Sequence, residues 1–195
     1  WRFPGTDPLG SYTIEHYTSI AAKAEAAKLD AVFLADTPAL EPTIRHRPGN
    51  NLEPSTVLAR IAARTEQIGL IGTLSSSYND PAELARRLGD LDHLSGGRFG
   101  WNVVTTAGPG AAANFGRVGE PDHGLRYRRA ETFVSQVVAS WDARTRLVSP
   151  QGRPVVVQAG GSSDGKRLAA KVGEVIFSAE QDITTARAFR TELRD

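Results

Sequence analysis

The sequence predicts an α/β protein built around a parallel sheet. Short apolar runs alternate with longer segments in which apolar residues recur at three- and four-residue spacing along the 195 residues. This alternation indicates βαβ units with parallel strands and right-handed crossovers. Polar residues follow several of the apolar runs, at the strand ends where α/β folds bind ligands. A doubly wound sheet and a (β/α) barrel both fit the pattern, and residues 1–195 are expected to form one domain.

The first half of the chain predicts three strands. The turn at Gly96-Gly97 is the clearest boundary, because leucines at helical spacing precede it and an aromatic, β-branched run follows it. Asp80 and Pro81 predict the start of that helix as an N-cap and first-turn proline, with Glu83 as the capping-box acid. The expected elements are a helix from Ser11 to about Leu29, a strand over 31–35, a loop over 37–52, a helix from Pro54, a strand over 68–73, a helix over 81–94 and a strand over 99–104.

The second half predicts two more strands. A long loop is expected over 107–122, followed by a helix whose apolar stripe runs from Tyr127 to Trp141. Residues 142–153 lack a period and are interpreted as a connection. The remaining expected elements are a strand over 154–159, a helix after the glycine-rich turn at 160–166, a strand over 174–178 and a last helix from Ile183 to Leu193.

Composition excludes several classes of function. Lys and Arg number 23 and Asp and Glu 22, so the net charge of +1 provides no overall field for nucleic acid or an anionic membrane. The absence of Cys excludes disulfides and thiolate metal sites, and a cytoplasmic location is expected. No apolar run approaches the roughly 20 residues that span a bilayer. The four histidines show no metal-ligand spacing, and no serine-hydrolase motif is present.

The turn Gly160-Gly161-Ser162-Ser163-Asp164-Gly165-Lys166 is a candidate phosphate site. Free backbone N–H groups at a helix start bind anions, and the Ser162 and Ser163 hydroxyls can assist. Its spacing matches the first seven positions of a P-loop, but Arg167 stands where a Ser or Thr should ligate Mg²⁺, which counts against a nucleotide triphosphatase. A glycine-rich turn without a ligand is the alternative.

Polar residues at the other strand ends are further candidates. Asp36 can orient a ligand or cap a turn, and Thr73 with Ser75–Ser77 offers donors or an exposed polar turn. Asn102 lies inside an apolar strand, so its amide needs partners if buried, in the backbone or in a ligand. His123 and Tyr127 are four residues apart on one helix face, so both can contact one ligand, or they are a surface His and a core Tyr.

Several motifs together resemble one family, the flavin-dependent monooxygenases of the bacterial luciferase-like superfamily, in the branch of nitrilotriacetate monooxygenase component A. The block from Leu91-Asp92-His93-Leu94-Ser95 through Trp101-Asn102-Val103-Val104-Thr105 is the most specific part of the resemblance. The other motifs are Phe33-Leu34-Ala35-Asp36, Glu53-Pro54, Ile68-Gly69-Leu70, Gly97-Arg98, Asn114-Phe115-Gly116, Arg126-Tyr127 and Gln158-Ala159-Gly160.

The resemblance implies a TIM-type (β/α)8 barrel and a two-component FMN-dependent monooxygenase. In that family a separate NAD(P)H:flavin reductase delivers reduced FMN, which forms a flavin hydroperoxide with O₂ and oxygenates a small organic substrate. His123 is also a candidate proton donor or base near the flavin. The family's flavin contacts fall on Asp36, Thr73, Asn102, His123, Tyr127 and Ser162, with Ser163 beside the phosphate.

The chain departs from the family pattern in length. The family's first strand and last βα units are not in this sequence, and the connection between Trp141 and Gln151 is shorter than expected, so the barrel is expected to be incomplete. A deazaflavin-dependent hydride transferase and a non-catalytic flavin-binding protein are the alternatives, with a P-loop nucleotide-binding module third. The loops over 37–52 and 107–122 are expected to select the substrate, and related barrels are commonly dimers or tetramers.

Overall fold

The fold centres on a five-stranded parallel sheet. The computed structural model describes residues 3–7, 9–39, 52–119, 122–143 and 149–194. The strands lie in sequential order, each pairing in parallel with the next. A doubly wound sheet reverses its strand order at a switch point, whereas a (β/α) barrel keeps the order of the chain. The strands are β1 (Ala31–Leu34), β2 (Gly69–Ser75), β3 (Phe99–Val104), β4 (Val155–Gln158) and β5 (Val175–Ile176).

The sheet curls as part of a barrel does. Phe33 of β1 and Phe177, just after β5, make an edge-to-face ring contact with centroids 5.4 Å apart. In a flat sheet, four steps of about 4.8 Å would separate the first strand from the fifth by roughly 19 Å. The ring contact therefore closes across the concave face. The described residues form an incomplete (β/α) barrel, as expected.

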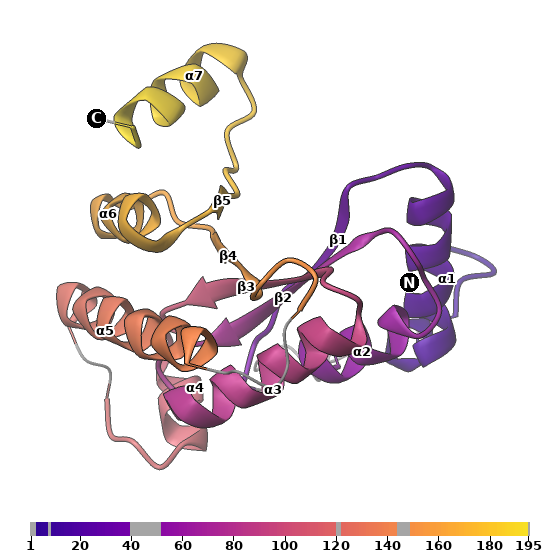
Figure 1. Cartoon of the computed structure of the whole chain (residues 1–195), viewed down its shortest axis with the longest axis horizontal. Helices are drawn as coiled ribbons and strands as arrows, with labels where there is room; N and C mark the ends of the chain where they lie inside the picture. Colours follow the sequence, from indigo (N-terminus) through magenta and orange to yellow (C-terminus); the bar gives the residue numbers. More distant parts are fainter. Residues whose placement is uncertain (1–2, 8, 40–51, 120–121, 144–148, 195) are drawn as a thin grey trace.

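Helices cover the outside of the curved sheet. They follow it from α1 at one end, through α2, α3 and α5, to α6 and α7 at the other (Figure 1). A 3₁₀ turn, η1 (Gly10–Tyr12), precedes the first helix. The helices are α1 (Ile14–Ala26), α2 (Pro54–Ala62), α3 (Pro81–Leu94), α4 (Pro109–Asn114), α5 (His123–Asp142), α6 (Ser163–Val172) and α7 (Ile183–Glu192).

One apolar core joins α1, α2, α3 and α5 to the convex face of the sheet. Its centre is Trp101, which is fully buried, with ring contacts to Phe133 and Trp141 of α5 and an indole N–H that donates to the Leu74 carbonyl at 3.1 Å. Because side chains alternate along a strand, Gly100 and Asn102 face the opposite, concave side. The strand residues of this core are Leu70, Leu74, Phe99, Trp101, Val103 and Val156.

The predicted start of α3 is confirmed. The Asp80 carboxylate accepts a hydrogen bond from the Glu83 N–H at 2.9 Å, with Pro81 in the first turn. The Glu83 side chain forms an ion pair with Arg86 at 3.3 Å instead of the predicted capping-box hydrogen bond. The Gly96-Gly97 turn is also confirmed, since both residues adopt left-handed φ values of 70° and 80°.

Several predicted boundaries were wrong. The first helix is shorter than expected, because a 3₁₀ turn precedes it and Lys28 leaves helical geometry at φ 61°. The expected loop over 107–122 contains α4, in which Pro109 begins a short helix that buries Ala111 and Ala112. The fifth strand is only two residues long, since it pairs with β4 alone. The predicted loop at 37–52 lies outside the described residues from 40 to 51.

The amino-terminal edge of the sheet is held by polar side chains that bond to backbone. The Arg98 guanidinium donates to the carbonyls of Ala62, Thr65 and Ile68 at 2.8 to 3.0 Å. The fully buried Asp92 accepts from the Phe99 N–H at 3.2 Å and from the Gln151 amide at 2.6 Å. These contacts join the start of β3 to its neighbours, so this edge stabilises the fold and leaves the opposite edge for ligands.

Candidate functional site

Thr73 and Asn102 meet on the concave face. They are register partners on β2 and β3, and the Asn102 amide N–H donates to the Thr73 hydroxyl at 2.9 Å. Both side chains are buried, at 4% and 3% exposed. Because the Thr73 oxygen accepts this bond, its own O–H remains to donate to a ligand.

Two buried amide oxygens in this region have no partner. Among the described residues, neither Oδ1 of Asn102 nor Oε1 of Gln158 accepts a hydrogen bond. Gln158 ends β4 and is 2% exposed. A buried polar atom without a partner costs about 1–3 kcal/mol. Asn102 faces the concave side, whereas Gln158, the register partner of Val103, faces the side of the apolar core, so the two oxygens mark separate points at which a ligand donor group can bind.

A cavity opens at the same edge of the sheet. It has a volume of about 560 Å³ and is lined by Asp36, Tyr127, Gln158 and the backbone around Gly108. This volume lies within the roughly 300–1,000 Å³ of small-molecule and cofactor sites. The ends of β1, β3 and β4 and the start of α5 therefore enclose one ligand-sized space.

Asp36 titrates unusually in this cavity. Burial raises the pKa of its carboxyl above the ordinary value and the nearby Glu53 carboxylate adds to the rise, while a hydrogen bond from the Thr37 N–H opposes it. Protonation of Asp36 therefore begins at a higher pH than for an exposed aspartate. Because the folded-state pKa is raised, the stability linked to this group is lost as the pH rises from the unfolded pKa through the folded one.

If the cavity binds FMN, as the family resemblance implies, its affinity for the reduced cofactor should fall as the pH drops through this raised pKa, because a protonated Asp36 accepts ligand N–H or O–H groups less well. Anaerobic titrations across the acidic range test this expectation. The Asp36→Asn variant should bind reduced FMN more weakly at neutral pH, and its affinity should no longer fall at acidic pH. If the affinity of this variant still falls at acidic pH, a group other than Asp36 is responsible for the titration.

The glycine turn after β4 packs tightly against Gln158. A Cβ at Gly160 would lie 2.8 Å from Nε2 of Gln158 and 3.2 Å from the Gly165 Cα, so no larger side chain fits without movement. Ser162 is the N-cap of α6, accepting from the Gly165 N–H at 3.1 Å, and Ser163 is the first helical residue. The first N–H groups of a helix have no intrahelical partner, so this turn can bind an anion.

His123 joins the starts of α5 and α6. Its Nδ1 lies 2.8 Å from a carboxylate oxygen of Asp164, and its ring packs on Tyr127 with centroids 4.8 Å apart. The hydrogen bond with His123 is the largest influence that lowers the pKa of Asp164, and Arg167 also contributes. An ionised carboxylate only accepts, so Nδ1 carries the proton and Nε2 remains for a ligand.

The structure brings most of the predicted site residues to one edge of the sheet. Asp36 and Tyr127 line the cavity, Thr73 bonds to Asn102, and His123 connects Tyr127 to the glycine turn. Thr73, Asn102, His123, Ser162 and Ser163 border this region without lining the cavity itself.

The hydroxyl cluster at 75–77 is mainly structural. The Ser75 hydroxyl accepts from Thr106 at 2.7 Å, and the Ser76 hydroxyl donates to the Val104 carbonyl at 2.9 Å. Both serines are buried, so the expectation of an exposed polar turn was wrong for them. They tie the end of β2 to the end of β3.

Gln158 was missed as a site residue. A polar residue directly after three valines was the available signal, since an amide at the end of a buried strand needs partners. For metal binding, the described residues contain no group of three or more His, Asp or Glu side chains that could hold an ion. Within the same residues, no helix has the length and apolar character needed to cross a membrane.

Comparisons with known proteins agree with this geometry. A family model described as luciferase-like monooxygenase matches residues 2–195. Nitrilotriacetate monooxygenase component A from Aminobacter aminovorans is 37% identical over 242 positions, covering 100% of this chain and 53% of the relative. The chain thus spans about half the length of the curated relatives it matches.

Two solved structures share the fold closely. EDTA monooxygenase from Chelativorans sp. BNC1 superimposes with a TM-score of 0.85 at 36% identity, covering 94% of this chain and 53% of that one. A riboflavin lyase, solved with modified FMN and riboflavin, gives a TM-score of 0.87 at 32% identity, covering 98% of this chain and 54% of that one.

Proposed function

Because the chain belongs to the luciferase-like monooxygenase family, we propose that the protein is a two-component monooxygenase. It uses reduced FMN from a separate NAD(P)H:flavin reductase and oxygenates a small organic substrate by way of a flavin hydroperoxide. The observation that carries this proposal is the unpartnered buried oxygen of Asn102 on the concave face, at the edge of the sheet where Asp36 and Tyr127 line a cavity.

The residues present fit FMN. A flavin ring system offers N–H donors and carbonyl acceptors, which match the amide oxygen of Asn102 and the hydroxyl of Thr73 on the concave face. The phosphate matches the start of α6, where Ser162 is the N-cap and Ser163 the first helical residue, with His123 beside them. Tyr127 lines the cavity between these two regions.

The chemistry needs little from the protein beyond binding and exclusion of water. The bound reduced flavin supplies two electrons to O₂, so that one oxygen atom enters the substrate and the other leaves as water. The apolar strand ends and the small residues of α4 provide a wall with few competing donors. His123 binds the cofactor through Nε2 and is also the candidate proton donor or base.

The proposal includes the rest of the assembly. The chain is assigned to one (β/α) barrel domain that forms a dimer or tetramer, and to the cytoplasm, where NAD(P)H supplies the reductase. The matched relatives are named for nitrilotriacetate and EDTA, which are both polycarboxylates, and for riboflavin, which has no carboxylate. The names of the relatives therefore do not determine the substrate class of this protein, which depends on its own side chains.

An anaerobic titration with reduced FMN tests the proposal. We expect saturable binding and, on mixing with air-saturated buffer, an absorbance transient that outlives that of free reduced FMN. Binding without the transient would favour hydride transfer or a non-catalytic flavin protein, and absence of binding would contradict the proposal. In the same experiment, an otherwise folded His123→Asn variant that binds normally but turns over slowly would support proton transfer, whereas weaker binding alone would leave His123 as a cofactor ligand.

A further inference from the structure

A second cavity adjoins the first. It has a volume of about 450 Å³ and lies between the turn after β2 and one face of α5. Thr106 lines both cavities, and the consecutive residues Arg126 and Tyr127 each line one of them. A molecule in the second cavity would therefore lie next to a ligand in the first.

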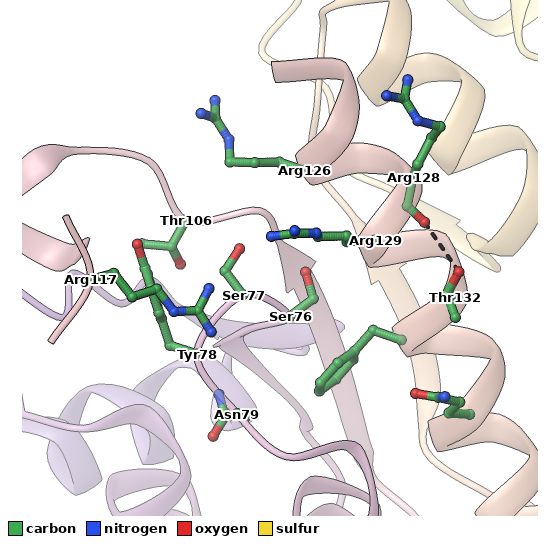
Figure 2. Close-up of a pocket in the computed structure, with 12 residues that line it drawn as sticks. Ser76, Ser77, Tyr78, Asn79, Thr106, Arg117, Arg126, Arg128, Arg129 and Thr132 are labelled. Atoms are coloured by element: carbon green, nitrogen blue, oxygen red, sulfur yellow. Dashed lines mark hydrogen bonds between the residues drawn. The ribbon is translucent and has the colours of Figure 1, made fainter. Parts of the chain in front are cut away.

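The lining of this second cavity is strongly basic. Among the described residues, its lining contains four arginines and no acidic residue, together with the hydroxyls of Ser77 and Thr106. Figure 2 shows Arg117 and Arg129 extending from opposite sides toward Ser76 and Ser77, whereas Arg128 points away from them. The arginines are Arg117, Arg126, Arg128 and Arg129.

Two of these arginines lack a charge partner. Within the described part of the chain, neither Arg117 nor Arg129 forms an ion pair, and the Ser77 hydroxyl forms no hydrogen bond. Some basic residues elsewhere do form ion pairs, as Lys171 does with Glu131 at 2.7 Å. Like charges that converge on one cavity repel each other, so an anion between them would be stabilised.

Aromatic stacking holds one side of the cavity in place. The Arg117 guanidinium lies over the Tyr78 ring, 5.1 Å from its centroid. Tyr78 in turn stacks on Phe115, with ring centroids 4.4 Å apart and planes 4° from parallel. Arg117 is thus positioned before any ligand arrives, which lowers the entropy lost on binding.

We propose that this second cavity binds the carboxylate groups of an organic polyanion, which is the substrate that the flavin oxygenates. The assignment of this ligand as substrate rests on the proposed function. Arg117 and Arg129 bind carboxylate oxygens from two sides, and the Ser77 hydroxyl donates a further hydrogen bond. A neutral substrate would leave both guanidinium groups without partners beside the reacting ligand.

The anion belongs to a second molecule rather than to the cofactor. The flavin phosphate has its own site at the start of α6, and neither Ser162 nor Ser163 lines the second cavity. Thr106, which donates to Ser75 at 2.7 Å, stands between the two spaces. The carboxylates then bind on one side of Thr106 and the remainder of the substrate points to the flavin on the other.

Calorimetric titration of the intact protein with tricarballylate, a tricarboxylate probe, tests the proposal. We expect one saturable site, weakened by roughly tenfold in each of Arg117→Gln and Arg129→Gln, since each removes one charge-assisted contact. Rising NaCl should weaken binding by screening. The trimethyl ester of the probe should not bind. Arg128→Gln is the matched control and should change affinity by less than about twofold, because its guanidinium points away.

Reduced FMN titrations of the same variants separate the two proposals. Unchanged FMN affinity together with weakened tricarballylate binding supports the carboxylate site. If Arg117→Gln and Arg129→Gln weaken FMN or inorganic phosphate binding instead, the cavity holds the cofactor's phosphate and the substrate assignment is overturned. Failure of tricarballylate to bind a protein that still reacts with reduced FMN and O₂ also overturns it, while leaving the proposed function in place.

Discussion

Replacing Asn102 by leucine is expected to lower the affinity for reduced FMN by roughly 30-fold, or about 2 kcal/mol, while changing the free energy of unfolding by less than about 1 kcal/mol. The amide oxygen of Asn102 has no partner among the described residues, so its removal costs the ligand-free fold little. Apolar burial by leucine offsets the lost bond to Thr73. Anaerobic FMN titration and urea denaturation measure the two quantities.

Thr73→Val is the companion variant for this prediction, because Thr73 is the other member of the hydrogen-bonded pair. It removes the other end of the same hydrogen bond at 2.9 Å but keeps the unpartnered Asn102 oxygen. Its effect on FMN affinity should be several-fold smaller than that of Asn102→Leu. If Asn102→Leu instead unfolds the protein at low urea and leaves FMN affinity unchanged, then Asn102 serves the sheet and not the cofactor.

Trp101→Ala is expected to destabilise the fold by about 4 kcal/mol, the largest effect of any single substitution considered. The indole is fully buried between the sheet and α5, in contact with Phe133 and Trp141. Removing it opens a cavity and leaves the Leu74 carbonyl without its 3.1 Å bond. Urea denaturation followed by circular dichroism measures the change without relying on tryptophan fluorescence.

Two further variants identify the source of that effect. Trp101→Phe keeps most of the ring volume and should cost about 2 kcal/mol. Lys171→Ala removes an exposed ion pair with Glu131 and should cost less than about 1 kcal/mol. A Trp101→Ala variant no less stable than Lys171→Ala would contradict the position of α5 against the sheet.

The candidate site was partly predictable because strand ends are visible in a sequence. Asp36, Thr73 and Asn102 each interrupt or follow an apolar run, and parallel strands bring such positions to one edge. The hydrogen bond between Thr73 and Asn102 was not predictable, because it depends on the pairing register of β2 with β3. Gln158 was missed because nothing in the valine run shows that its amide oxygen lies buried without a partner.

The arginine-lined cavity was not predictable from the sequence. Its lining comes from the turn at 76–79, from Thr106, from Arg117 and from one face of α5. These segments lie up to 60 positions apart in the sequence, from Ser76 to Gln136. The net charge of +1 does not reveal that four arginines line one cavity. Like charges become neighbours here only because α5 packs beside the turn that follows β2.

The sequence by itself determined the alternation of strands and helices, the cap at Asp80 and the left-handed turn at Gly96-Gly97. These features depend on local backbone preferences and on which side of an element is apolar. The hydrophobic pattern left a doubly wound sheet and a barrel open, and only the family resemblance implied the barrel. The structure establishes it, because strand order and the curl that brings Phe33 to Phe177 arise from contacts between distant segments. A hydrophobic period indicates that one face of a helix or strand is buried, but it does not indicate which neighbouring element covers that face.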